Sequence, residues 1–98
     1  MRDPIHSGAM LSVIGRDPSD GTLGIALAST SIAIGSRCPH IDVGHVAVAS
    51  QGFTNLKVGP LALDLVRCGL TGLEVMEALR QHDRFLEYRQ IGIVTVDG

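Results

Sequence analysis

Short apolar runs separated by clusters of turn-forming residues dominate the first half of the chain, a pattern typical of β-strands. Residues 11–16 and 22–29 are two such runs. The segment 17–21 between them reads Asp-Pro-Ser-Asp-Gly, in which proline cannot donate to a strand ladder and Asp-Gly favours a tight turn. The pattern therefore predicts a β-hairpin at the start of the fold.

Three further strands are expected. Residues 42–50 are rich in β-branched valine and predict a third secure strand, and residues 90–96 predict the last one. A shorter strand is expected at 32–34, closed by Gly35. Residues 51–57 are predicted to form a loop.

Two helices are predicted between the third and the last strand. One runs over residues 60–68, with proline tolerated in its first turn and Gly69 ending it. Thr71 and Glu74 form the Thr-x-x-Glu pattern of a capping box, which begins a second helix that extends to about His82. One face of the second helix is expected to enter the core through Leu73, Met76 and Leu79.

Strands first and helices later predict an α+β fold, with two helices on one face of an antiparallel sheet. Residues 25–28 and 46–49 are apolar at every position, so neither face of such strands suits water. With 98 residues, of which 45% are hydrophobic and 18% charged, we expect the second face to be covered from outside. The expected cover is a second sheet, supplied by self-association or by a C-terminal half chain.

Composition narrows the classes of function. The net charge is −2 and the eight basic residues are scattered, which argues against nucleic acid as a partner. No apolar run is long enough to span a membrane, and the first ten residues lack the apolar segment of a signal peptide. Cys38 and Cys68 are expected to be free thiols of a cytoplasmic protein, and we expect no cofactor.

The chain resembles domain-of-unknown-function family 1028. The resemblance covers residues 11–98 and is carried by the runs SVIGRDPSDGTLGIALAS, CGLTGLEVMEAL and YRQIGIVTVDG. Its most specific parts are Arg16-Asp17-Pro18, Thr54-Asn55 and Arg89-Gln90. Through this family the chain resembles the N-terminal-nucleophile hydrolases, whose αββα sandwich stacks two antiparallel sheets between helix layers. Residues 10–98 would be the N-terminal half of that domain, and residues 1–9 a flexible leader, a tag or a genuine extension.

The resemblance implies hydrolysis of a small amide. In these hydrolases the first residue of the mature chain is Thr, Ser or Cys, and its free amine serves as the base. The matching position here is Met10, which offers neither a hydroxyl nor a thiol. The alternative function is a non-catalytic binding or assembly module on the same scaffold.

Four polar residues are candidates for a catalytic site: Ser12, Ser29, Gln51 and Asn55. Strand alternation puts Ser12 on the same face as Met10, and the hairpin brings Ser29 opposite Met10. The amides of Gln51 and Asn55 could donate to an oxyanion. The structural alternatives are a buried serine bonded to backbone, a plain turn at Ser29 and a loop held by asparagine. Gln90 is interpreted as structural.

A second group of residues suggests a metal site. Alternation over residues 38–42 places a thiol, an imidazole and a carboxylate on one face of an extended segment. With a second imidazole they could complete a tetrahedral zinc set of Cys38, His40, Asp42 and His45. Their spacing matches no standard zinc pattern, so this set is only an alternative to free side chains.

Overall fold

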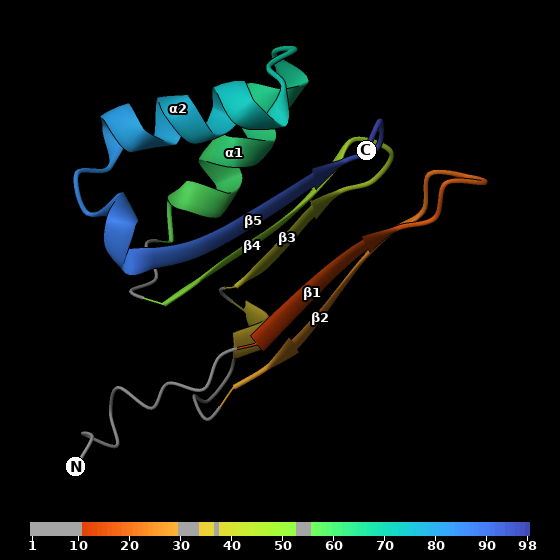
Figure 1. Cartoon of the computed structure of the whole chain (residues 1–98), viewed down its shortest axis with the longest axis horizontal. Helices are drawn as coiled ribbons and strands as arrows, with labels where there is room; N and C mark the ends of the chain where they lie inside the picture. The colour runs from red at the N-terminus through yellow and green to blue at the C-terminus, as the bar shows by residue number, and fades with distance from the viewer. Residues whose placement is uncertain (1–10, 30–33, 37, 53–55) are drawn as a thin grey trace.

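The computed structural model describes residues 11–29, 34–36, 38–52 and 56–98 and has an α+β architecture. Three layers stack on one another in Figure 1: two helices, a three-stranded sheet and a two-stranded hairpin. In chain order the elements are β1 (Leu11–Arg16), β2 (Leu23–Ala28), the 3-10 turn η1 (Ile34–Ser36), β3 (Pro39–Asp42), β4 (Val46–Gly52), α1 (Val58–Arg67), α2 (Gly72–His82), the 3-10 turn η2 (Leu86–Tyr88) and β5 (Arg89–Thr95).

The predicted hairpin is confirmed. β1 and β2 pair antiparallel, with Leu11 opposite Ala28 and Arg16 opposite Leu23. At the tip of the connection, Asp17 accepts hydrogen bonds from the backbone N–H and the hydroxyl of Ser19. The turn chemistry of residues 17–21 therefore fixes the register of the two strands.

The expectation of a single antiparallel sheet is wrong. β3, β4 and β5 form one antiparallel sheet, and the hairpin of the same chain forms a second sheet stacked on it. Small residues on the hairpin side of the three-stranded sheet make this close stacking possible. A Cβ atom at Gly92 in β5 would lie only 2.9 Å from Cδ1 of Ile14 in β1.

The central strand β4 is covered on both faces by this arrangement. Every residue from 46 to 50 is buried. By the ladder registers, Val46 and Val48 face the helices, whereas Ala47 and Ala49 face the hairpin. The inference that strand 46–49 needs two covers is confirmed, with both covers coming from the chain itself.

The third strand begins later than predicted, and an additional strand precedes it. Residues 43–45 form a turn, in which Gly44 has a φ of 78° and His45 N–H donates to the carbonyl of Asp42 at 3.0 Å. Glycine adopts this left-handed conformation without steric cost, which outweighs the strand preference of the neighbouring valine. The strand expected at 32–34 is not found at Ile34, which begins η1, and residues 32 and 33 lie outside the described part.

The predicted end of α1 and start of α2 are confirmed, α1 begins two residues earlier than predicted, and of the predicted core face Leu79 and Met76 are confirmed but Leu73 is wrong. Gly69 follows α1 with a φ of 96°, and at the start of α2 both hydrogen bonds of the Thr71–Glu74 capping box are present. Val75 and Leu79 form the buried face of α2, whereas Leu73 is 85% exposed. Leu73 is six positions before Leu79, so it lies about 120° away around the helix.

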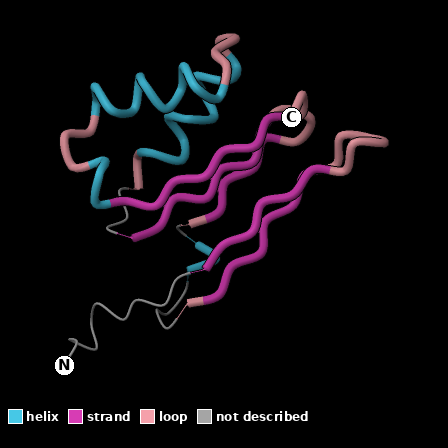
Figure 2. Tube along the Cα trace, viewed as in Figure 1, coloured by secondary structure: helices cyan, strands magenta, loops and turns pink. Residues whose placement is uncertain are grey.

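The outer face of the hairpin is apolar and exposed. Side chains of β1 and β2 alternate between the inner face, which packs on the three-stranded sheet, and this outer face. Leu11 is 65% exposed and Val13 is 61% exposed. Figure 2 shows the two strands at the margin of the molecule, on the side away from the helices. The outer face consists of Leu11, Val13, Gly15, Gly24, Ala26 and Ala28.

Candidate functional site

Two of the four residues proposed for catalysis meet between the two sheets. Ser12 lies on the inner face of β1, and Gln51 lies at the end of β4, on the face toward the hairpin. Gln51 is also the direct ladder partner of Gln90 in β5. We refer to Ser12, Gln51 and Gln90 as the polar cluster.

Gln51 is the centre of the polar cluster. Its Nε2 donates to Oγ of Ser12 at 3.2 Å and to Oε1 of Gln90 at 3.1 Å. Gln51 is only 4% exposed, and its own Oε1 is buried with no hydrogen-bond partner among the residues that the structure describes. Ser12 is half-buried and Gln90 is exposed, so the cluster extends from the space between the sheets to the surface.

The contacts of Ser12 define what its hydroxyl can do. Within the described part of the chain, its side chain bonds only to the neutral amide of Gln51, which is a donor. A nucleophilic serine instead needs a base that removes its proton. The hydroxyl is therefore held as an acceptor by Gln51 and retains its own hydrogen for donation.

Of the other two catalytic candidates, only Ser29 lies in the described part of the chain. Ser29 directly follows β2 and is half-buried, and the hydrogen bonds of the polar cluster do not include it. Its predicted neighbour Met10 and the fourth candidate, Asn55, lie outside the described residues. Gln90, interpreted from sequence as structural, is the residue that takes a place beside Ser12 and Gln51.

The alternative metal set does not assemble. Cys38, His40 and Asp42 share the helix face as alternation predicts, but each is engaged with its surroundings. Cys38 is fully buried, and the ring of His40 lies so close to α1 that a Cβ at Gly59 would be 2.1 Å from it. Across residues 11–29, 34–36, 38–52 and 56–98, no group of three His, Cys, Asp or Glu side chains could hold a metal ion.

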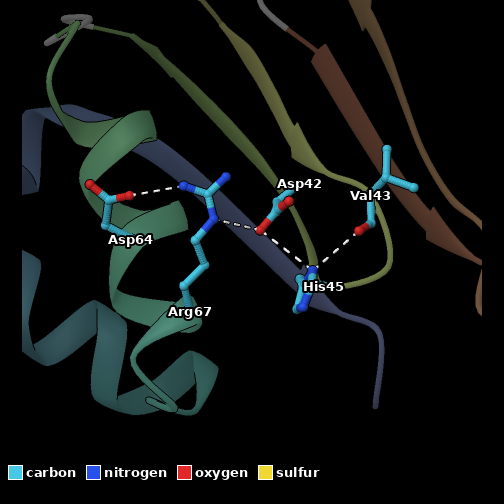
Figure 3. Close-up of polar contacts among 5 residues, drawn as sticks. All are labelled: Asp42, Val43, His45, Asp64 and Arg67. Atoms are coloured by element: carbon cyan, nitrogen blue, oxygen red, sulfur yellow. Dashed lines mark hydrogen bonds and ion pairs between the residues drawn. The ribbon is translucent and has the colours of Figure 1, made fainter.

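Asp42 belongs instead to a chain of polar contacts at the outer end of β3 (Figure 3). Its Oδ2 accepts a hydrogen bond from Nε of Arg67 at 2.8 Å, and Nδ1 of His45 lies 3.5 Å from the same oxygen. Nη1 of Arg67 donates to Asp64 at 3.1 Å. The hydrogen bond from Arg67 lowers the pKa of Asp42 below its usual value, and the same contact raises the pKa of Arg67.

The Asp42–Arg67 contact predicts a pH-dependent contribution to stability. Because the folded-state pKa of Asp42 is below the usual 3.8, the contact stabilises the fold above about pH 4 and is lost as the pH falls through the folded pKa. Arg67→Met is therefore expected to lower the free energy of unfolding at pH 7 but much less at pH 3, as measured by urea denaturation. In an Asp42→Asn background the difference between the two pH values should shrink, because only the contact of Arg67 with Asp64 then remains. An equal loss at pH 7 and pH 3 in the otherwise native chain would contradict this account.

A buried ion pair fixes the segment that leads into β5. Nη2 of Arg89 donates to Oδ1 of Asp83 at 3.0 Å, and Nε of Arg89 donates to Oδ2. The two side chains are 9% and 8% exposed. The bond to Asp83 raises the pKa of Arg89. Because Asp83 ends α2 and Arg89 begins β5, the pair positions the neighbouring Gln90.

The ion pair lines a hollow of about 350 Å³. Its walls carry apolar side chains from α2, η2 and β5 together with charges of both signs: Met76, Arg80, Asp83, Arg84, Leu86, Glu87, Arg89 and Ile91. Cζ of Arg84 lies 4.9 Å from the centroid of the Phe85 ring. The sequence contained one signal for this region, the Arg89-Gln90 pair that carries part of the family resemblance.

In the described part of the chain, neither α1 nor α2 is long and apolar enough to cross a membrane. No curated protein and no solved structure shows significant similarity to the sequence. Residues 11–98, from the first residue of β1 to the end of the chain, match the family described as "Family of unknown function (DUF1028)". The match spans the hairpin, both helices and the three-stranded sheet. The chain is a member of the DUF1028 family.

Proposed function

We propose that the chain is a binding module that takes a small amide-bearing ligand at the polar cluster, without hydrolysis by Ser12. The observation that carries this proposal is the buried Oε1 of Gln51, which has no hydrogen-bond partner in the described structure. Burying a polar atom unpaired costs about 1–3 kcal/mol. Buried polar atoms normally have a hydrogen-bond partner, and the exceptions are typically found at functional sites.

The free hydrogen-bonding capacity of the cluster complements an amide. Oε1 of Gln51 can accept a hydrogen bond, and the hydroxyl of Ser12 can donate one. An amide group carries one N–H donor and one carbonyl acceptor, so it supplies the partner that each of these two groups requires. The side chain of Gln90 is exposed and bonded to Gln51, so its rotation would free Nε2 of Gln51 for a ligand.

The contacts of Ser12 favour binding over hydrolysis. Hydrolysis by Ser12 needs a group that accepts its proton, and the amide of Gln51 donates a hydrogen bond to Oγ instead. This arrangement supports the non-catalytic module over the amidohydrolase that the wider resemblance implies.

Substitution of Gln51 by methionine tests the proposal. Methionine has a similar length and no polar group, so Gln51→Met removes the unpaired buried oxygen, while water can serve the exposed parts of Ser12 and Gln90. The free energy of unfolding is expected to stay unchanged or rise by about 1 kcal/mol. In the native chain, N-methylacetamide should shift the backbone amide NMR signals of the polar cluster. In Gln51→Met these shifts should be absent.

Gln81→Met is the matched control, because Gln81 is exposed on α2, outside the polar cluster, and its substitution should change neither stability nor the signal shifts. Absence of signal shifts in the native chain at high amide concentration would refute the binding site. Release of methylamine that disappears in Ser12→Ala would refute the non-catalytic assignment and establish hydrolysis.

A further inference from the structure

Within β1 and β2 the outer face of the hairpin carries no polar side chain, and Thr22 borders this face next to the turn. A sheet face that meets water in a soluble protein normally carries polar residues at alternate positions. Here the alternate positions hold Leu11, Val13 and Gly15 on β1, and glycine and alanine on β2. This face therefore offers a small, contiguous apolar surface to another protein surface.

The large and small residues of this face are sorted between the two strands. In the ladder register, Leu11 is opposite Ala28, Val13 is opposite Ala26, and Gly15 is opposite Gly24. Both bulky side chains therefore stand on β1, and β2 offers a low surface along its whole length. A shallow hollow follows that surface, with Val13 at its border and Gly24 and Ala26 in its lining.

We propose that this face binds the same face of a second copy of the chain, related by a twofold axis that runs along the strands. That rotation places β1 of each copy over β2 of the other copy and keeps the register. Val13 of one copy then lies over Ala26 of the other, and Leu11 over Ala28. Each bulky side chain meets a small one, so the face is complementary to itself, as a twofold interface requires.

The geometry of sheet packing identifies the central contact. Two sheets that pack face to face cross at about 30°, which displaces the ends of the strands more than their centres. Val13 and Ala26 are near the middle of their strands. The Val13–Ala26 contact across the axis is therefore the one that the proposal predicts most sharply.

The size of the face sets the expected strength of the dimer. A strand of six residues spans about 20 Å, and two strands give a face about 10 Å wide. Stable complexes bury about 1,200–2,000 Å² in total, which is more than two such faces provide. The dimer should therefore be weak, with a dissociation constant in the micromolar to millimolar range.

A pair of complementary charges tests the arrangement. Val13→Glu and Ala26→Lys each place a charge at an exposed position, so both variants are expected to fold. Sedimentation of the native chain from about 10 μM to 1 mM should show a monomer–dimer equilibrium. Either variant alone should dimerise at least tenfold more weakly. An equimolar mixture of the two should recover association, because the new glutamate of one copy lies over the new lysine of the other.

The control and the contrary outcomes are also defined. Leu73→Glu introduces a charge at an exposed site on α2, remote from the hairpin, and should leave association unchanged. A native chain that stays monomeric at 1 mM, or a dimer unaffected by Val13→Glu, would overturn the proposal. A mixture that fails to associate while the native chain dimerises would exclude β1 lying over β2 of the other copy.

Discussion

Replacement of Leu79 by alanine is expected to lower the free energy of unfolding by about 2–5 kcal/mol. Leu79 is fully buried on the face of α2 that packs toward the sheet, in the cluster that includes Val46, Val48 and Val75. The loss combines the transfer free energy of the removed methyl groups with the cost of the cavity that remains. Urea denaturation followed by circular dichroism measures the change.

Leu73→Ala is the matched control on the same helix. Leu73 is almost fully exposed, so the same chemical change should alter the free energy of unfolding by no more than about 0.5 kcal/mol. Equal losses for the two substitutions would contradict the orientation of α2 described here. The pair therefore tests directly which face of α2 enters the core.

Substitution of Arg89 by methionine is expected to destabilise the fold by about 3–5 kcal/mol. The guanidinium binds the carboxylate of Asp83 through two hydrogen bonds, and both side chains are buried. Removing Arg89 leaves a buried carboxylate without its counter-charge. The resulting loss in the free energy of unfolding is larger than the net stabilisation that the intact pair provides. Thermal and urea unfolding of the variant measure the loss.

A double substitution separates the buried charge from the packing of the arginine. In the native chain, the backbone N–H of Phe85 donates a hydrogen bond to Oδ1 of Asp83 at 3.0 Å. Asp83→Asn keeps an oxygen that can accept this bond and removes the negative charge. Asp83→Asn combined with Arg89→Met should therefore recover most of the stability that Arg89→Met alone loses. If the double variant is less stable than Arg89→Met alone, the cost lies in lost packing and the electrostatic explanation fails.

Local features of the fold were predictable from the sequence because short-range chemistry determines them. The hairpin follows from the turn residues 17–21, the start of α2 from the capping box at Thr71, and the end of α1 from Gly69. The strand 90–96 was displaced by only one residue from β5. For the hairpin turn, the capping box and Gly69 the deciding contacts lie within a few residues in the chain, whereas β5 is recognisable from its own apolar run.

Features that depend on long-range packing were not predictable in the same way. Apolar strands indicate that two covers are needed, but not that the hairpin stacks on the other sheet instead of joining its edge. In the sequence, Leu73 fits an apolar helix face as well as Val75 does. Only the packing of α2 on the sheet determines that the buried face is the one with Val75 and Leu79. The Asp83–Arg89 pair joins the end of α2 to the start of β5. The sequence pattern of a helix gives no indication of which residue of a later strand it will contact.

In the polar cluster, too, single residues were predictable from the sequence but their long-range contacts were not. Ser12 and Gln51 were each identified from strand position and residue type, but their contact required the stacking of the two sheets. Gln90 enters the cluster only through the register of β4 with β5, which places it opposite Gln51. A register cannot be derived from apolar runs such as 46–49, because no polar residue within them distinguishes one face from the other.

Ser12 and Val13 are consecutive residues of β1 and point in opposite directions, one into the polar cluster and the other onto the outer face. The proposed amide site and the proposed contact between two copies therefore share one strand. If the two binding events are coupled through β1, the coupling is reciprocal: each changes the affinity of the other by the same factor. The affinity of the chain for an amide should then vary with protein concentration, and saturation with an amide should shift the monomer–dimer equilibrium.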